Sequence, residues 1–100
     1  MVRQLEVTER LERTLQETPH LDFLRSFEAV ARLGGIGKAA EALHLAQPTV
    51  STQLKELAQA LNLHLLEPEG RGVRLTPHGE LLAETVRDLF ARWRRFEEDA

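Results

Sequence analysis

Hydrophobic residues recur at helical spacing near the start of the chain. Val7, Leu11 and Leu15 lie four residues apart with charged residues between them, which predicts an amphipathic helix over residues 2–17. Thr18-Pro19 ends this segment, because a residue that precedes proline disfavours the α conformation. The first twenty residues are therefore expected to form a helical extension, which either packs on its own domain or adds to a dimer interface.

Further helical patterns follow. A helix is expected from residue 21 or 22 to about residue 33, and the pair Gly34-Gly35 stops it. Its apolar stripe consists of Phe23, Leu24, Phe27, Val30 and Ala31. A short Ala-rich helix is expected over residues 38–44, and a longer one opens at Gln47-Pro48, where proline suits a first helical turn. Two helices joined by about three residues are typical of a helix-turn-helix.

The helix that opens at Gln47 separates its residues onto two faces. Its apolar residues recur at intervals of four, three and four, and they are Val50, Leu54, Leu57 and Leu61. Such a stripe is expected to pack inward. The residues left on the outside are polar: Gln47, Thr49, Ser51, Thr52, Gln53, Lys55 and Glu56.

A hairpin and a final helix complete the pattern. The apolar or alternating runs 63–66 and 73–75 flank the segment 68–72, which contains two glycines, and this predicts a small two-stranded hairpin. A hairpin in this position is a wing. Thr76 then suits the cap of a helix with Pro77 at its first position.

The final helix carries a heptad-like repeat of its own. Spacings of four, three, four and three residues connect Leu82, Val86, Leu89, Trp93 and Phe96. This seam of about two heptads is long for one small domain. The spacing is that of the a/d seam of a coiled coil, and the helix that carries it is expected within residues 77–100.

Composition narrows the class of protein. The chain has 100 residues, enough for one small domain, and its 18 Leu and 11 Ala against 6 Val and 1 Ile favour a mostly helical fold. It has no cysteine, which excludes disulfides and thiolate chemistry. No apolar run approaches the ~20 residues of a membrane span. The charged N-terminus does not suit a signal peptide, so we expect a soluble, cytoplasmic protein with no membrane partner.

The sequence offers no catalytic or metal-binding pattern. The histidines at positions 20, 44, 64 and 78 fall in different predicted elements, without the spacing of a metal site. Neither a nucleophile with its base nor a phosphate-binding loop is present. An enzyme is therefore the least favoured class, and we expect no cofactor, metal or small-molecule effector within this chain.

Several short motifs combine into one signature between Leu21 and Leu89. They are Ala39-Ala40, Leu43-His44, Gln47-Pro48, Ser51, Gln53-Leu54, Leu57 and the closing Val73-Arg74-Leu75-Thr76-x-x-Gly79-Glu80. In this signature the chain resembles the N-terminal winged helix-turn-helix of LysR-type transcriptional regulators. The resemblance implies a bacterial transcription regulator that binds double-stranded DNA as a homodimer. Residues 21–76 would be the DNA-binding domain and residues 77–100 the linker helix, which forms the dimer as a coiled coil.

The sequence also departs from the family pattern. Regulators of this family carry a ligand-sensing domain after the linker helix, so the chain is either a fragment or a stand-alone DNA-binding domain. Gly37, Ala46 and Thr52 stand where polar or basic residues are common, and Pro68 stands where arginine is usual. Each of these changes removes a polar or basic contact. Asn62 replaces a frequent glycine.

The resemblance and the side-chain chemistry together predict the DNA contacts. The second helix of a helix-turn-helix, here about residues 47–60, lies in the major groove and reads base edges. Its candidate residues are Gln47, Pro48, Thr49, Ser51, Thr52 and Lys55. Lys38 is expected to hold phosphate near a helix N-terminus. Arg71, between two glycines in the wing of about residues 65–75, is expected to enter the minor groove or follow its backbone, and Arg74 is a weaker candidate.

Charge keeps a second hypothesis open. Residues 21–79 carry six Lys or Arg and six Asp or Glu, a net charge of zero. Phosphate neutralisation supplies most non-specific DNA affinity, so a single chain would bind weakly. Dimerisation compensates, because two linked half-sites raise the effective concentration. The alternative is a protein-interaction module with the same fold, which binds a partner regulator and has weak or no DNA binding.

Overall fold

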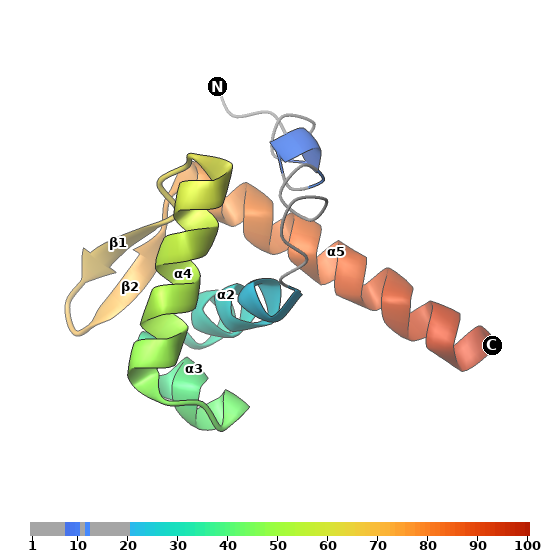
Figure 1. The fold of residues 1–100 in the computed structure, drawn as a ribbon, viewed down its shortest axis with the longest axis horizontal. Helices are drawn as coiled ribbons and strands as arrows, with labels where there is room; N and C mark the ends of the chain where they lie inside the picture. Colours follow the sequence, from blue (N-terminus) through green and yellow to red (C-terminus); the bar gives the residue numbers. More distant parts are fainter. Residues whose placement is uncertain (1–7, 11, 13–20) are drawn as a thin grey trace.

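The computed structural model describes residues 8–10, 12 and 21–100. Its order of elements is a helix-turn-helix, a wing and a long final helix, which confirms the mostly helical winged fold (Figure 1). The elements are α2 (Leu21–Leu33), α3 (Ile36–Leu43), α4 (Gln47–Leu61), β1 (Leu66–Glu69), β2 (Gly72–Leu75) and α5 (Pro77–Asp99). The apolar residues of the predicted N-terminal helix, Val7, Leu11 and Leu15, lie outside the described residues.

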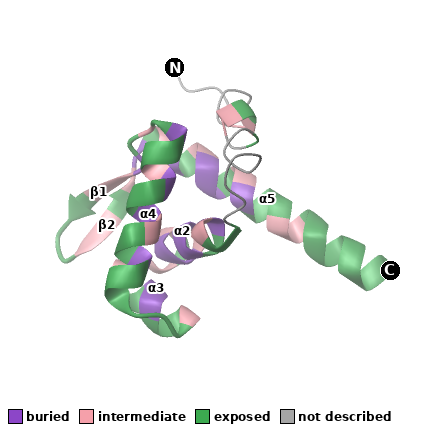
Figure 2. Ribbon diagram, in the orientation of Figure 1, coloured by how far each residue is buried: buried purple, intermediate pink, exposed green. Residues whose placement is uncertain are grey.

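The core forms where α2, α3, α4 and the first half of α5 meet, and Figure 2 shows the buried positions gathered there. Phe27 of α2 lies at its centre and is completely buried. The predicted inward stripe of α4 is buried along its whole length, and it consists of Val50, Leu54, Leu57 and Leu61. Because this stripe fixes the rotation of α4 about its axis, the polar face predicted opposite to it is directed away from the core.

Two helices end in a left-handed residue. His44 after α3 has φ 57° and Asn62 after α4 has φ 54°. The N–H of Asn62 donates to the carbonyl of Gln59 at 3.1 Å, which closes the last turn of α4. Asparagine tolerates this conformation better than most residues, so Asn62 preserves the turn without a glycine.

The strands of the wing differ from the prediction. Only Leu66 of the run 63–66 belongs to β1, whereas Pro68 and Glu69, which were expected in the turn, extend the strand to a two-residue tip at Gly70 and Arg71. Pro68 lies opposite Val73 in the hairpin. The N–H of Val73 points away from Pro68 and donates to the carbonyl of Gly34 at 3.2 Å. A proline is therefore tolerated in β1, because this strand lies at the edge of a two-stranded sheet.

A cluster of short contacts joins the start of α5 to the segment after α4. The Thr76 hydroxyl donates to the carbonyl of His64 at 2.6 Å and accepts a hydrogen bond from the N–H of Gly79 at 3.0 Å, while the Thr76 N–H donates to the carbonyl of Leu65 at 3.0 Å. A Cβ on Gly79 would lie 2.2 Å from that carbonyl oxygen. The helix cap predicted at Thr76 is present, and it also joins α5 to the segment between α4 and β1.

The apolar seam predicted on α5 divides into two parts, which corrects the prediction. Leu82 and Val86 are completely buried in the core of their own domain, so they cannot contact a second chain without opening it. Leu89 is 37% exposed, and Trp93 and Phe96 are each 60% exposed. The end of α5 that carries these residues projects from the core (Figures 1 and 2). Neither α5 nor another described helix is both long and apolar enough to cross a bilayer.

The close approach at Gly79 predicts opposite effects for one substitution at two glycines. Gly79→Ala should destabilise the fold by about 2 kcal/mol, because the added methyl group would collide with a backbone carbonyl that cannot move independently. Gly37→Ala, where the nearest atom is 3.5 Å away and the backbone is helical, should stabilise it by up to about 1 kcal/mol. Chemical unfolding of both variants tests this, and equal effects at the two sites would contradict the assigned contact.

Candidate nucleic-acid interface

The polar face of α4 is exposed in its first two turns. Gln47, Pro48 and Thr49 are exposed at the start of the helix, and Ser51, Thr52 and Lys55 continue the same exposed surface. Beneath this surface, Val50 and Leu54 anchor the helix in the core. The side chains predicted to read DNA are therefore presented on a helix whose opposite side is fixed.

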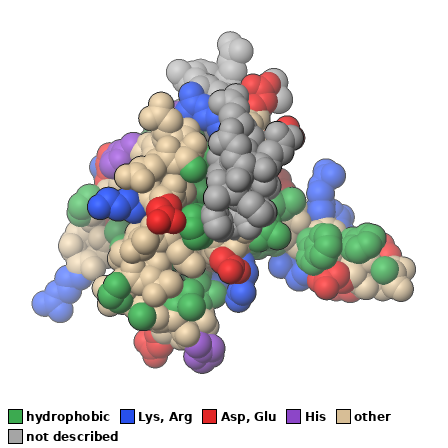
Figure 3. All heavy atoms as spheres, viewed as in Figure 1, with side chains coloured by type: hydrophobic (Ala, Val, Ile, Leu, Met, Phe, Trp, Pro, Cys, Tyr) green, Lys and Arg blue, Asp and Glu red, His purple; other side chains and the backbone are tan. Residues whose placement is uncertain are grey.

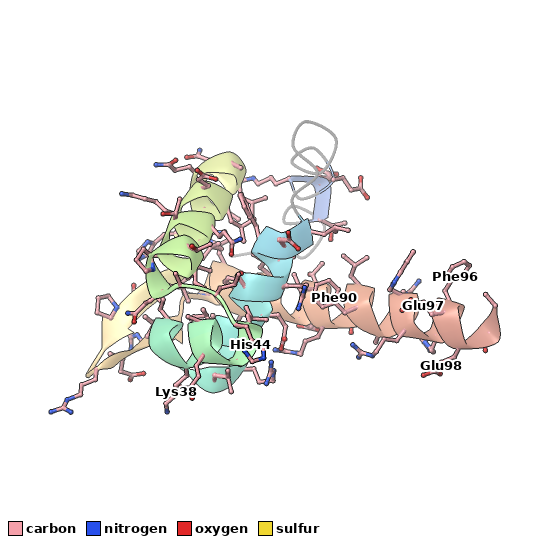
Figure 4. All side chains as sticks on the ribbon, turned by 60° about the horizontal axis from the view of Figure 1, so that its bottom comes forward. Lys38, His44, Phe90, Phe96, Glu97 and Glu98 are labelled. Atoms are coloured by element: carbon pink, nitrogen blue, oxygen red, sulfur yellow. The ribbon has the colours of Figure 1, made fainter. Side chains whose placement is uncertain are left out.

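Three of the predicted contact residues come together from three different elements. One groove is lined by the turn between α2 and α3, the start of α3, the start of α4 and the tip of the wing. The predicted residues that line it are Lys38, Gln47 and Arg71. Lys38 is exposed, and Figure 4 shows it projecting from α3 away from the core. Two cations, an amide and the carboxylate of Glu69 thus border one groove, and they come from segments far apart in sequence.

Glycines make this groove possible. A Cβ on Gly72 would lie 2.4 Å from the carbonyl oxygen of Gly34, so the wing could not approach the end of α2 as closely with any other residue. At the start of α3 the capping residue Gly35 makes no side-chain hydrogen bond. The first N–H groups of α3, beside Lys38, therefore lack a side-chain acceptor from this cap, and helix N-termini of this kind attract anions.

Ser51 and Lys55 border a second groove, between α4 and β1, together with residues 64–68. Arg74 lies elsewhere, in a groove with Glu67, Pro77 and Glu80 at the start of α5. Its Nε and Nη2 atoms donate to Glu67 Oε2 at 3.1 and 2.7 Å. This hydrogen bond and the Glu67 charge raise the pKa of Arg74 above its usual value, and the Glu69 charge adds to the shift. Arg74 is therefore an already paired cation.

A buried contact that apolar spacing does not predict connects α2 to α4. The hydroxyl of Ser26, which is 1% exposed, donates a hydrogen bond to Gln53 Oε1. Gln53 was predicted on the outward face of α4. Because of this contact it is half-buried, and it lies at the edge of that face. The available signal was the serine itself, because it lies next to the apolar stripe of α2 and a buried hydroxyl needs a partner.

Basic side chains only slightly outnumber acidic ones around the site. Lys38, Lys55 and Arg71 are exposed on the elements just described, while Glu56 and Glu69 are exposed beside two of them. Within the described residues, no cluster of three or more His, Asp or Glu side chains is arranged to hold a metal ion. The geometry fits the binding of a polyanion through a few contacts.

A second exposed surface lies on the other side of the domain. The rings of Trp93 and Phe96 are 5.4 Å apart, centre to centre, and tilted by 36°. Figure 3 shows hydrophobic side chains on the projecting end of α5, with basic and acidic side chains beside them. Two exposed aromatic side chains that lie side by side are characteristic of a protein–protein interface.

Known proteins resemble the chain in sequence. Residues 21–80 match the family model described as bacterial regulatory helix-turn-helix protein, lysR family. The transcriptional regulator TrpI of Pseudomonas aeruginosa is 43% identical over 79 residues, which are 79% of this chain and 27% of TrpI. PcaQ of Agrobacterium fabrum is 45% identical over 58 residues, 58% of this chain and 19% of PcaQ. The chain thus spans about a quarter or less of these two regulators.

Solved structures resemble it in fold. The DNA-binding domain of BenM, in a complex with catB site 1 DNA, superimposes with a TM-score of 0.75 at 33% identity and covers 79% of this chain and 88% of that one. A CbnR domain in a DNA complex gives 0.73 at 33% identity, with 78% and 90% covered. On the family match and these likenesses together, the chain belongs to the LysR family of bacterial helix-turn-helix regulators.

Proposed function

We propose that this chain binds double-stranded DNA in a sequence-specific manner as a homodimer and regulates transcription. The observation that carries the proposal is the groove where Lys38, Gln47 and Arg71 meet, next to the exposed polar face of α4. The solved DNA complexes of BenM and CbnR domains with the same fold support it. We also infer that the protein acts in the cytoplasm, where bacterial DNA is found.

In this proposal, α4 enters the major groove and its first two turns read the bases. Gln47 offers an amide that can bond adenine through two hydrogen bonds, and Thr49 and Thr52 offer methyl groups that suit thymine. Pro48 and Ser51, which lie among these residues on α4, also contact the DNA. Lys55, one turn further along, reaches guanine or phosphate. Specificity therefore comes from short polar side chains rather than from arginine.

The remaining contacts hold the backbone. Lys38 binds a phosphate with help from the N–H groups at the start of α3. Arg71, at the tip of the wing between two glycines, enters the minor groove or follows its edge. Arg74 contributes less, because Glu67 already satisfies it. Few phosphate contacts per chain make the homodimer necessary for strong binding.

The second candidate function is a protein-interaction module of the same fold. The observation that favours it is the net charge of zero over residues 21–79. In the wing, Glu67 pairs with Arg74, and Glu69 is exposed beside Arg71. Such a module would bind a partner regulator through α5 and contact DNA weakly. The two candidates differ in whether the purified chain selects a DNA sequence.

Selection from random duplex DNA distinguishes the two candidates. We expect the purified chain to enrich a motif of two related half-sites whose centres lie about one helical turn apart, as a two-fold dimer requires. Sequencing of the bound duplexes at two salt concentrations measures this, and affinity should fall as salt rises. A folded dimer that enriches no sequence at low salt would favour the interaction module.

Arginine substitutions in the wing separate its two cations. Arg71→Ala should weaken binding to the selected site and lower the slope of log affinity against log salt by about 1 per subunit. Arg74→Ala, the matched control in the same hairpin, should change either quantity much less because its charge is already paired. Fluorescence anisotropy titrations at several salt concentrations provide both values. Equal losses from the two variants would refute the distinction.

A base-reading residue should behave differently from these cations. Thr49→Ala should reduce the ratio of specific to non-specific affinity while leaving the salt slope unchanged, because it removes a hydroxyl and a methyl group but no charge. Competition of the selected duplex against random duplex measures this ratio. An unchanged ratio would mean that Thr49 is not on the reading face.

Dimerisation can be tested with two leucines of nearly equal exposure. Leu89→Glu should convert the dimer to a monomer, because it would bury a charge in the interface. Leu45→Glu, at a leucine that is 38% exposed in the turn before α4, should leave the dimer intact. Light scattering of both variants gives the molecular mass. A dimer that persists in Leu89→Glu would place the interface elsewhere.

A further inference from the structure

The two faces of the wing differ in chemistry. The face that packs against the core is apolar, and it carries Leu66, Val73 and Leu75. Successive residues of a strand alternate between faces, so Glu67, Glu69 and Arg74 share the opposite, outer face. Glu67 and Arg74 lie directly opposite each other in the hairpin. The cation of the outer face is therefore outnumbered by carboxylates, and one of them is its cross-strand neighbour.

Both carboxylate oxygens of Glu67 are close to a partner. Oε2 accepts hydrogen bonds from Nε and Nη2 of Arg74 at 3.1 and 2.7 Å, and Oε1 lies 3.7 Å from Nε2 of His64. The carbonyl of His64 in turn accepts a hydrogen bond from the Thr76 hydroxyl at 2.6 Å. The partners of Glu67 thus come from β2 and from the segment before β1. Arg74 meets an acceptor that is already in place.

Arg74 lies near enough to the wing tip to act on the same DNA as Arg71. It follows Arg71 by three residues, which at a rise of about 3.3 Å per residue is about 10 Å along β2. Duplex DNA carries one negative charge about every 1.7 Å along its axis. Unscreened interactions extend over about 10 Å at 0.1 M salt. In the proposed complex, Arg74 would therefore lie within the field of the phosphates that surround Arg71.

Glu67 opposes any gain from this proximity. To bind a phosphate, Arg74 would have to give up charge-assisted hydrogen bonds for others of the same kind. The released carboxylate would then repel the same phosphates. Counterion release requires positive charge at the backbone, and the pair of Glu67 and Arg74 supplies no net charge. Among the wing residues 66–75, all of which the structure describes, Arg71 is the cation that no carboxylate holds.

We propose that Glu67 competes with DNA phosphate for Arg74 and thereby limits each wing to one phosphate-binding arginine. Glu67 is a positioning residue, because it acts through Arg74 and does not itself contact DNA. The limit keeps the affinity of a single chain low, so binding depends on base reading and on the second half-site of a dimer. The proposal rests on the proposed DNA binding and deepens it, because it assigns control of affinity to an acidic residue of the wing.

Replacement of Glu67 by its neutral isostere tests the competition. Glu67→Gln should release Arg74, because an amide holds a guanidinium less tightly than a carboxylate does. Affinity for a random duplex should rise about five-fold, and the slope of log affinity against log salt should steepen by about 1 per subunit. In an Arg74→Ala background the same substitution should raise affinity much less, since it frees no cation. Fluorescence anisotropy titrations at several salt concentrations give both quantities.

Glu80→Gln is the matched control. Glu80 borders the same groove as Arg74 and loses the same charge, but the guanidinium of Arg74 donates to Glu67, so affinity should change little. Because Glu67 and Arg74 form a partly exposed pair, the unfolding temperature of Glu67→Gln should match that of the wild type. A gain in affinity would then reflect the freed cation and not a change of fold.

Other outcomes would overturn the proposal. An equal gain from Glu67→Gln with and without Arg74, or an equal gain from Glu80→Gln, would mean that Glu67 acts only as a repelling charge. An unchanged salt slope would mean that Arg74 does not reach a phosphate. A wild-type chain that binds no duplex at low salt would refute the proposed function itself. A chain that binds DNA equally well with and without the Glu67 carboxylate would refute only the competition.

Discussion

The contact between Gly79 and the carbonyl of Leu65 determines how the two halves of the molecule are related. Leu65 lies between α4, the helix proposed to read DNA, and the wing. Gly79 lies in the first turn of α5, which carries the exposed residues Leu89, Trp93 and Phe96. Thr76 adds hydrogen bonds to His64 and Leu65 at the same point. The direction of α5 is thereby fixed relative to α4. In a homodimer built on α5, this fixed direction sets the distance and angle between the two reading helices.

The same helix performs two tasks, and burial separates them. The first half of α5 completes the core through Leu82, Ala83 and Val86, and the second half carries the exposed residues from Leu89 onward. A continuous heptad repeat covers both halves in the sequence, because core packing and helix pairing require the same spacing. The repeat therefore predicted that α5 has a buried side along its length, but it could not tell which part is buried by its own domain.

Local chemistry determined how much of the molecule was predictable from the sequence. The helices, the cap at Thr76 and the inward stripe of α4 follow from apolar spacing and capping residues, which act within a few positions of one another. The strand limits around Pro68 and the pairing of Arg74 with Glu67 depend on the partner strand, so spacing along one strand could not reveal them. The groove shared by Lys38, Gln47 and Arg71 likewise depends on how three elements pack.

Neighbouring residues of α2 have different surroundings. Arg25 borders the groove between α2 and α5, while Ser26 turns inward and holds Gln53 of α4. The core stripe already prevents α4 from rotating, so this hydrogen bond adds alignment along the contact between the helices rather than most of its stability.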